Sequence, residues 1–135
     1  MKRILIGVVL CGIGCGAGTN GGTPPPTTHL LDQQSITIPA GQAEAVGPYT
    51  VPDGATITYE ITDTPTGIGS DSMDVGIATD ATAQASNPTL FASQTDVSSV
   101  TGTTPDLSAG AYDLYVACHN LSDNCIFDET TTAFY

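Results

Sequence analysis

Apolar residues recur at every second position through much of the chain after residue 30, and this period constrains the fold more than any other feature. In the run 55–62, the apolar residues Ile57, Tyr59 and Ile61 alternate with polar ones. Successive side chains of a β-strand point to opposite sides, so this period puts the apolar set on one face. The run therefore predicts a half-buried antiparallel strand.

The same alternation recurs in other segments, which are separated by clusters of Gly, Pro, Asn and Asp. The further alternating sets are Ile36 and Ile38; Met73, Val75 and Ile77; and Tyr112, Leu114, Val116 and Cys118. The turn residues between them recur at intervals typical of a β-sandwich. A helix is expected only at 80–86, which is too short to be stable alone. We predict one all-β domain, an antiparallel sandwich of about eight strands over residues 30–135.

Two cysteines, Cys118 and Cys125, flank a short polar turn between the last two expected strands. In an oxidising compartment such a pair is expected to be bonded. The alternative is a metal or redox site, with His119 as a third ligand. The spacing is not the Cys-x-x-Cys of redox proteins, and three ligands are fewer than a structural zinc site uses. We therefore predict a disulfide.

The segment 107–116, LSAGAYDLYV, resembles the "L-x-x-G-x-Y-x-L-x-V" strand of bacterial pre-peptidase C-terminal domains. The segments 51–57 and 71–75 are similar to the opening strand and the acidic strand of that family. Its members are small jelly-roll-like sandwiches appended to secreted enzymes and surface proteins. The resemblance implies a jelly-roll-like arrangement of the predicted strands.

The first residues have the order of an export signal. Lys2 and Arg3 precede an apolar run at 4–13, as in a secretory signal peptide. An alternative is that this run is retained as a membrane anchor. It is shorter than the roughly 20 residues that cross the hydrocarbon core. We therefore expect the signal to be removed.

The end of this signal resembles the processing site of bacterial lipoproteins, in which a cysteine receives the lipid. Cys15 follows the small residue Gly14 and is the favoured lipidation site, whereas Cys11 follows the bulky Leu10 and is the second choice. Cleavage after Ala17 without acylation is a further alternative. An acylated cysteine would anchor the protein to a lipid bilayer.

Residues 16–29 are rich in Gly, Pro and Thr, including three consecutive prolines at 24–26. Glycine makes a segment flexible and proline extends it, so we expect a disordered tether here. The predicted organisation is a signal peptide at 1–15, a linker at 16–29 and the sandwich at 30–135. Gly16 follows Cys15 where an Asp would favour inner-membrane retention, so this resemblance implies an exported lipoprotein of the outer membrane or cell surface.

Removal of the signal leaves no lysine and no arginine. The loss of Lys2 and Arg3 takes the formal net charge from −12 to −14. Nucleic-acid binding depends on Lys and Arg contacts with phosphates, so no nucleic-acid partner is expected. An anionic domain attracts cations or basic partners instead.

No combination of residues predicts catalysis. His29 and His119 are the histidines, and neither lies in a recognisable nucleophile or metalloprotease motif. Paired carboxylates can cleave glycosides, but the chain has no Trp to form the usual sugar platforms. We expect a protein that is not an enzyme.

An acidic stretch at 62–80 is a candidate calcium site. It contains Asp63, Asp71, Asp74 and Asp80, and carboxylate oxygens are the ligands that calcium selects. Their spacing is not that of an EF-hand, and the alternative is that they are solvated loop charges. No other cofactor is expected.

These observations lead to one functional hypothesis and two alternatives. The first is a membrane-anchored, non-enzymatic surface module that binds a glycan or a cationic protein. The second is a structural, self-associating envelope or surface-coat protein, in which Phe134 and Tyr135 contact neighbouring copies. The third, based on the family resemblance, is an accessory module of a secreted hydrolase.

Overall fold

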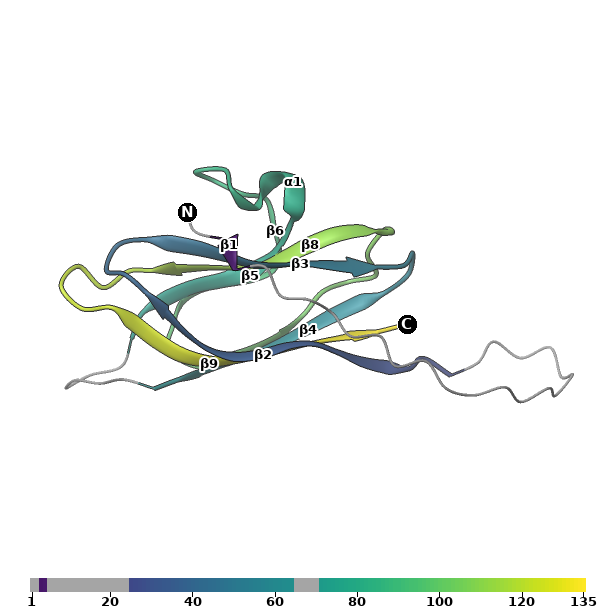
Figure 1. The fold of residues 1–135 in the computed structure, drawn as a ribbon, viewed down its shortest axis with the longest axis horizontal. Helices are drawn as coiled ribbons and strands as arrows, with labels where there is room; N and C mark the ends of the chain where they lie inside the picture. Colours follow the sequence, from purple (N-terminus) through teal and green to yellow (C-terminus); the bar gives the residue numbers. More distant parts are fainter. Residues whose placement is uncertain (1–2, 5–24, 65–70) are drawn as a thin grey trace, which may run out of the picture.

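The computed structural model describes residues 3–4, 25–64 and 71–135 (Figure 1). Two facing sheets contain the strands β2 (Thr28–Ile38), β3 (Ala43–Val51), β4 (Thr56–Asp63), β5 (Met73–Thr79), β6 (Leu90–Val97), β7 (Val100–Thr103), β8 (Gly110–Cys118) and β9 (Cys125–Phe134). The short helix α1 (Asp80–Ala83) follows β5, and β1 (Arg3–Ile4) lies at the edge of one sheet. The predicted all-β sandwich of about eight strands is confirmed.

The strand order is that of a jelly roll. One sheet has the order β2-β9-β4-β7 and the other β3-β8-β5-β6, with antiparallel pairing throughout. Strand β1 extends the second sheet by pairing in parallel with β3 at Ala45 and Val46. Two four-stranded sheets built from interleaved Greek keys define this architecture.

The core lies between the sheets and is built from the predicted alternating sets. Ile57, Tyr59 and Ile61 of β4 point into it and are buried, as are the alternating residues of β5 and β8. Two of these strands also bury their other face, which the period of two did not predict. Ala78 and Tyr115 pack there against Ala83 of α1, which lies over the outer side of this sheet (Figure 1).

The first strand of the sandwich begins earlier than expected. β2 begins at Thr28, so Thr28 and His29, at the end of the predicted linker, pair with Phe134 and Ala133 of β9. The period of two is interrupted near Leu31 by a register shift, which hid this part of the strand from the pattern. None of the helices among the described residues is long and apolar enough to span a membrane. Cys11 and Cys15, the predicted lipidation sites, lie outside the described residues.

Gly102 lets the buried ring of Tyr59 cross the neighbouring strand. The two residues are partners in the β4–β7 ladder, and a Cβ at Gly102 would lie 2.3 Å from the Tyr59 hydroxyl oxygen. We expect Gly102→Ala to lower the free energy of unfolding by about 3 kcal/mol, because overpacking forces a buried ring to move. Chemical denaturation measures this. Gly110→Ala is the matched control, since its Cβ would meet atoms no nearer than 3.5 Å, and equal losses in both variants would contradict the prediction.

Candidate functional site

The disulfide joins the last residue of β8 to the first residue of β9 at one end of the sandwich. Cys118 and Cys125 are bonded at an S–S distance of 2.02 Å, and both are buried. The predicted disulfide is confirmed. Because β8 and β9 belong to different sheets, the bond also ties the two sheets together. It closes the loop 119–124, which we call the tip, at what we call the disulfide end of the domain.

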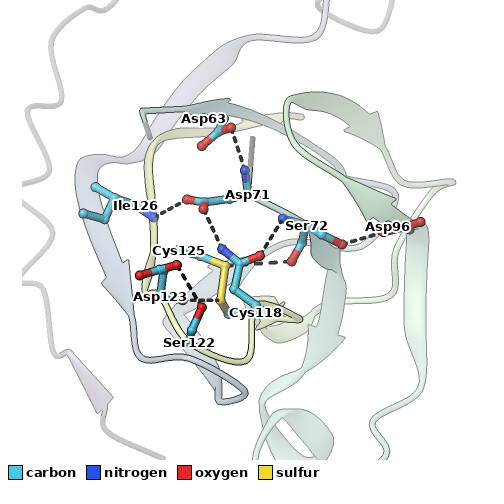
Figure 2. Close-up of a disulfide and its surroundings, with 10 residues drawn as sticks. Asp63, Asp71, Ser72, Asp96, Cys118, Ser122, Asp123, Cys125 and Ile126 are labelled. Carbon is cyan, nitrogen blue, oxygen red and sulfur yellow. Dashed lines mark hydrogen bonds between the residues drawn. A yellow bond between two sulfur atoms is a disulfide. The ribbon is translucent and has the colours of Figure 1, made fainter. Parts of the chain in front are cut away.

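Asp71 fastens the β4–β5 connection to the tip and to the start of β9 (Figure 2). Its carboxylate accepts hydrogen bonds from the Asn120 amide at 2.7 Å and from the backbone N–H of Ile126 at 2.8 Å. Its own N–H donates to the Asp63 carboxylate at 3.0 Å. Hydrogen bonds to a carboxylate are among the stronger ones in proteins. Asp71 therefore joins the end of β4 to the region of Asn120 and Ile126, which lie 49 and 55 residues further along the chain than Asp71.

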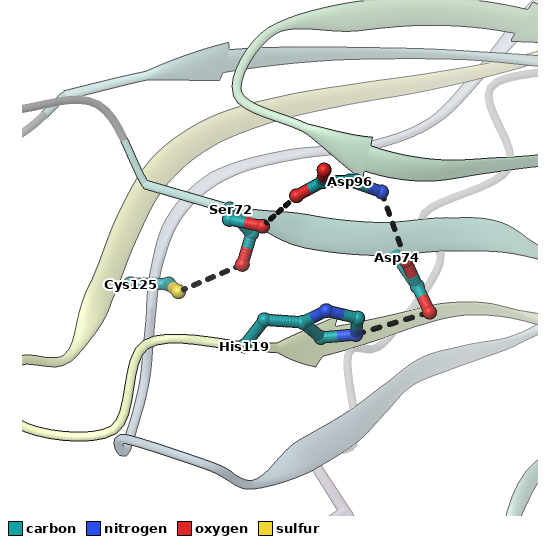
Figure 3. Close-up of polar contacts among 5 residues, drawn as sticks. All are labelled: Ser72, Asp74, Asp96, His119 and Cys125. Atoms are coloured by element: carbon teal, nitrogen blue, oxygen red, sulfur yellow. Dashed lines mark hydrogen bonds and ion pairs between the residues drawn. The ribbon is translucent and has the colours of Figure 1, made fainter.

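A second polar network runs along the same end (Figure 3). The Ser72 hydroxyl donates to the Asp96 carboxylate at 2.5 Å, and the Asp96 N–H donates to Asp74 at 3.0 Å. The other oxygen of Asp74 lies 3.0 Å from Nε2 of His119. Both side chains of this pair are partly exposed, and exposed pairs of this kind contribute at most about 1 kcal/mol to stability.

The four predicted calcium ligands do not converge. Asp63 and Asp71 are in contact, and Asp74 belongs to the second network. Asp80 begins α1, at the opposite end of β5 from Asp71. Within the part of the chain that the structure describes, no three His, Cys, Asp or Glu side chains form a group suited to a metal ion. Calcium binding stays a prediction. Burial and the nearby Asp71 raise the pKa of Asp63.

A buried polar cluster between the sheets was missed by the sequence analysis. Glu129 is 1% exposed and accepts a hydrogen bond from the Thr131 hydroxyl at 2.7 Å. Asp32 lies beside it and accepts a hydrogen bond from the Gln34 amide at 2.8 Å. Burial, reinforced by the charge of Asp32, raises the pKa of Glu129 to about 7. The available signal was positional, because Glu129 alternates in register with the core residue Phe127.

Large exposed apolar side chains lie at two opposite ends of the domain. Leu121, in the tip, is 94% exposed. Leu30 and Tyr135 are 61% and 41% exposed and lie where β2 begins and β9 ends, at the other end of the long axis (Figure 1). The rings of His29 and Tyr135 stack in parallel at 4.1 Å. We call the stacked pair His29 and Tyr135 the terminal patch, whereas Leu30, paired with Thr132, points to the outer side of the sheet.

Neither the family models nor the curated proteins include a match to this chain. Solved structures do match. A chain from Bacillus endospore appendages, described as a novel family of disulfide-linked pili, aligns with a TM-score of 0.52 at 12% identity, over 93% of this chain and 97% of that one. A chain of the cyanophage Pam1 capsid aligns with a TM-score of 0.42 at 17% identity, over 89% and 93%. The likeness to the appendage chain concerns the fold and extends over nearly its whole length.

Proposed function

We propose that this chain is a structural subunit of an extracellular surface assembly, in which copies associate with one another. The observation that carries the proposal is the position of the large exposed apolar side chains. Leu121 lies at one end of an elongated domain, and Leu30 and Tyr135 lie at the other. Singly exposed apolar side chains are normal on protein surfaces, so the proposal depends on their position at both ends, where contact with a neighbour removes them from water. Two such sites on opposite ends give each copy a place for two neighbours.

Electrostatics favours contact through the ends over contact through the sides. Residues 25–135 contain no Lys or Arg, and the outer face of the β2-β9-β4-β7 sheet carries the exposed carboxylates Glu60 and Asp128. When two copies lie side by side, the like charges on their adjacent sheets repel one another. An end-to-end contact keeps these faces apart while it removes apolar surface from water.

The comparisons and the sequence support an exported structural role. The similar appendage chain belongs to proteins described as disulfide-linked pili, so this type of sandwich occurs in an extracellular fibre. The Cys118–Cys125 disulfide is compatible with an oxidising compartment. The predicted export signal at 1–15 leads to the same compartment.

A second candidate is the anchored binding module predicted from the sequence, with Cys15 or Cys11 acylated. A shallow polar depression on β2 and β9 favours it. The lining includes Gln33, Ser35 and Asp128, whose amide, hydroxyl and carboxylate groups are suited to hydrogen bonds with a glycan. The partner in this candidate is a glycan or a cationic protein.

Self-association of the processed, exported protein separates the two candidates. We expect the mass measured by sedimentation velocity to rise with protein concentration and elongated particles to appear in electron micrographs. A protein that stays monomeric at every concentration and is captured by a glycan would overturn the structural role and support the binding module.

Salt should promote both folding and assembly. With 14 acidic side chains and no Lys or Arg after residue 3, the domain is destabilised by repulsion between its own carboxylates. Raising the ionic strength from about 10 to about 150 mM shortens the screening length from roughly 30 to 8 Å. We expect a higher melting temperature and larger assemblies over this range, measured by calorimetry and light scattering. A melting temperature that does not change with salt would contradict the repulsion argument.

A further inference from the structure

We propose that the tip of one copy docks onto the terminal patch of the next copy, with Leu121 against the stacked rings of His29 and Tyr135. This inference rests on the proposed function and specifies its contact. The partner is a second copy of this chain, bound head to tail.

The tip presents one exposed apolar side chain that is suited to contact with another copy. Leu121 is almost fully exposed, and it is surrounded in sequence by the polar residues of 119–124. The tip is closed by the disulfide and held at Asn120 by the Asp71 carboxylate. A loop fixed in this way loses little conformational entropy on binding. An apolar centre within a polar rim is also the usual anatomy of a protein interface.

The terminal patch offers an apolar surface that its own sandwich leaves uncovered. His29 is paired with Ala133, which is buried, so His29 lies on the core-facing side of its sheet. Tyr135 is two residues further along and lies on the same side. Backbone hydrogen bonds with Thr27, at 2.8 and 3.2 Å, hold Tyr135 in line with β2. The stacked pair therefore continues the core-facing surface outward, and a leucine is the kind of side chain that packs on it.

Charge favours the same pairing. Within residues 25–135, which contain no Lys or Arg, His29 and His119 are the basic side chains. His119 is already in contact with Asp74, whereas His29 belongs to the terminal patch. The tip carries Asp123, which is exposed two residues from Leu121. Docking the tip on the patch brings a carboxylate toward an imidazole in an otherwise repulsive system.

The two surfaces differ from each other and lie at opposite ends, so the contact is heterologous. Each copy that binds through its tip leaves its own patch open for the next. A heterologous contact of this kind builds an open chain of subunits unless its rotation closes a ring. The geometry thus favours a linear fibre, in which all copies have the same direction, over a closed dimer.

The experiment uses the full exported protein and three variants that each add one negative charge. Leu121→Asp removes the apolar side chain of the tip, and Tyr135→Asp disrupts the terminal patch. Thr101→Asp is the control on the exposed side of β7. All three positions are exposed or partly so, and circular dichroism with thermal melting verifies that each variant folds. We expect the first two to weaken self-association at least about 10-fold, as loss of an interface anchor does. Thr101→Asp should assemble like the unmodified protein.

Mixing the two defective variants tests the polarity of the contact. Leu121→Asp retains a patch and Tyr135→Asp retains a tip, so the equimolar mixture should form dimers but nothing longer. Dimers of Tyr135→Asp alone would indicate tip-to-tip contact and overturn the inference. Unchanged assembly of both variants would overturn the head-to-tail contact and leave the structural role standing. An unmodified protein that never associates would overturn both.

Discussion

Glu129→Gln should increase the stability of the domain at pH 8 by about 3 kcal/mol and remove most of its pH dependence between pH 5 and 8. Burial raises the pKa of Glu129 in the folded state from 4.5 to about 7. Each unit of such a shift corresponds to about 1.4 kcal/mol. Because the folded pKa is raised, the contribution of Glu129 is fully present below about pH 4.5 and is lost as the pH rises through about 7. The unmodified protein should therefore be most stable in mild acid.

The geometry around Glu129 explains this sign. One carboxylate oxygen accepts from Thr131, while the other is buried with no hydrogen-bond partner in the described part of the chain. Asp32 adds a negative charge nearby. A protonated carboxyl group avoids the cost of a buried, poorly paired charge. Glutamine keeps nearly the same shape, and its amide is never charged.

Denaturant titrations at pH 5, 6, 7 and 8 measure the effect. Glu60→Gln is the matched control, because Glu60 is an exposed residue of the neighbouring strand β4. We expect its stability to follow that of the unmodified protein within about 0.5 kcal/mol. If Glu129→Gln retained the full pH dependence, the buried carboxyl group would not be its source.

Removal of the disulfide should cost about 2.5 kcal/mol in a Cys118→Ala/Cys125→Ala double variant. The bond spans a sequence separation of 7, and the chain-entropy model assigns this magnitude to so short a loop. For a domain of this size, the melting temperature should fall by about 10 °C. The Asp71 hydrogen bonds still hold Asn120 of the tip and Ile126 of β9, so the rest of the sandwich should stay folded.

Calorimetry with and without a reductant measures the contribution of the disulfide. The reductant should lower the melting temperature of the unmodified protein to that of the double variant and leave the double variant unchanged. We also expect the double variant to self-associate more weakly at temperatures where both proteins remain folded, because its tip is no longer closed by the disulfide. Equal melting temperatures in the oxidised protein and the double variant would refute a stabilising role.

Much of the fold could be predicted from local patterns. The alternation in β4, β5 and β8 identified the buried residues, because strands that cover one side of a core carry apolar residues at every second position. The turn between Cys118 and Cys125 identified the disulfide for a similarly local reason. Strands β6 and β7 are largely exposed or short, so they carry no such pattern. The second buried face of β5 and β8 depends on α1, which no period of two reveals.

The candidate site was only partly predictable, because its contacts join distant segments. Asp71 was predicted only as a calcium ligand, and its hydrogen-bond partners Asn120 and Ile126 lie 49 and 55 residues further along the chain. Likewise, Tyr135 was considered for contacts between copies, whereas its stacking with His29 follows from the β2–β9 register. Pairings of this kind depend on strand order, which the residue pattern does not specify.

By itself, the amino-acid sequence determined that the body of this protein is an anionic β-sandwich with one cysteine pair at the turn between its last two strands. Side-chain alternation and charge are properties of neighbouring residues and can be read without a fold. Only the tertiary structure decided that Glu129 is enclosed beside Asp32 and that Leu121 and Tyr135 lie at opposite ends. Burial and position in space arise from which strands pair and where the sheets stop, and those contacts are made between residues far apart in the chain.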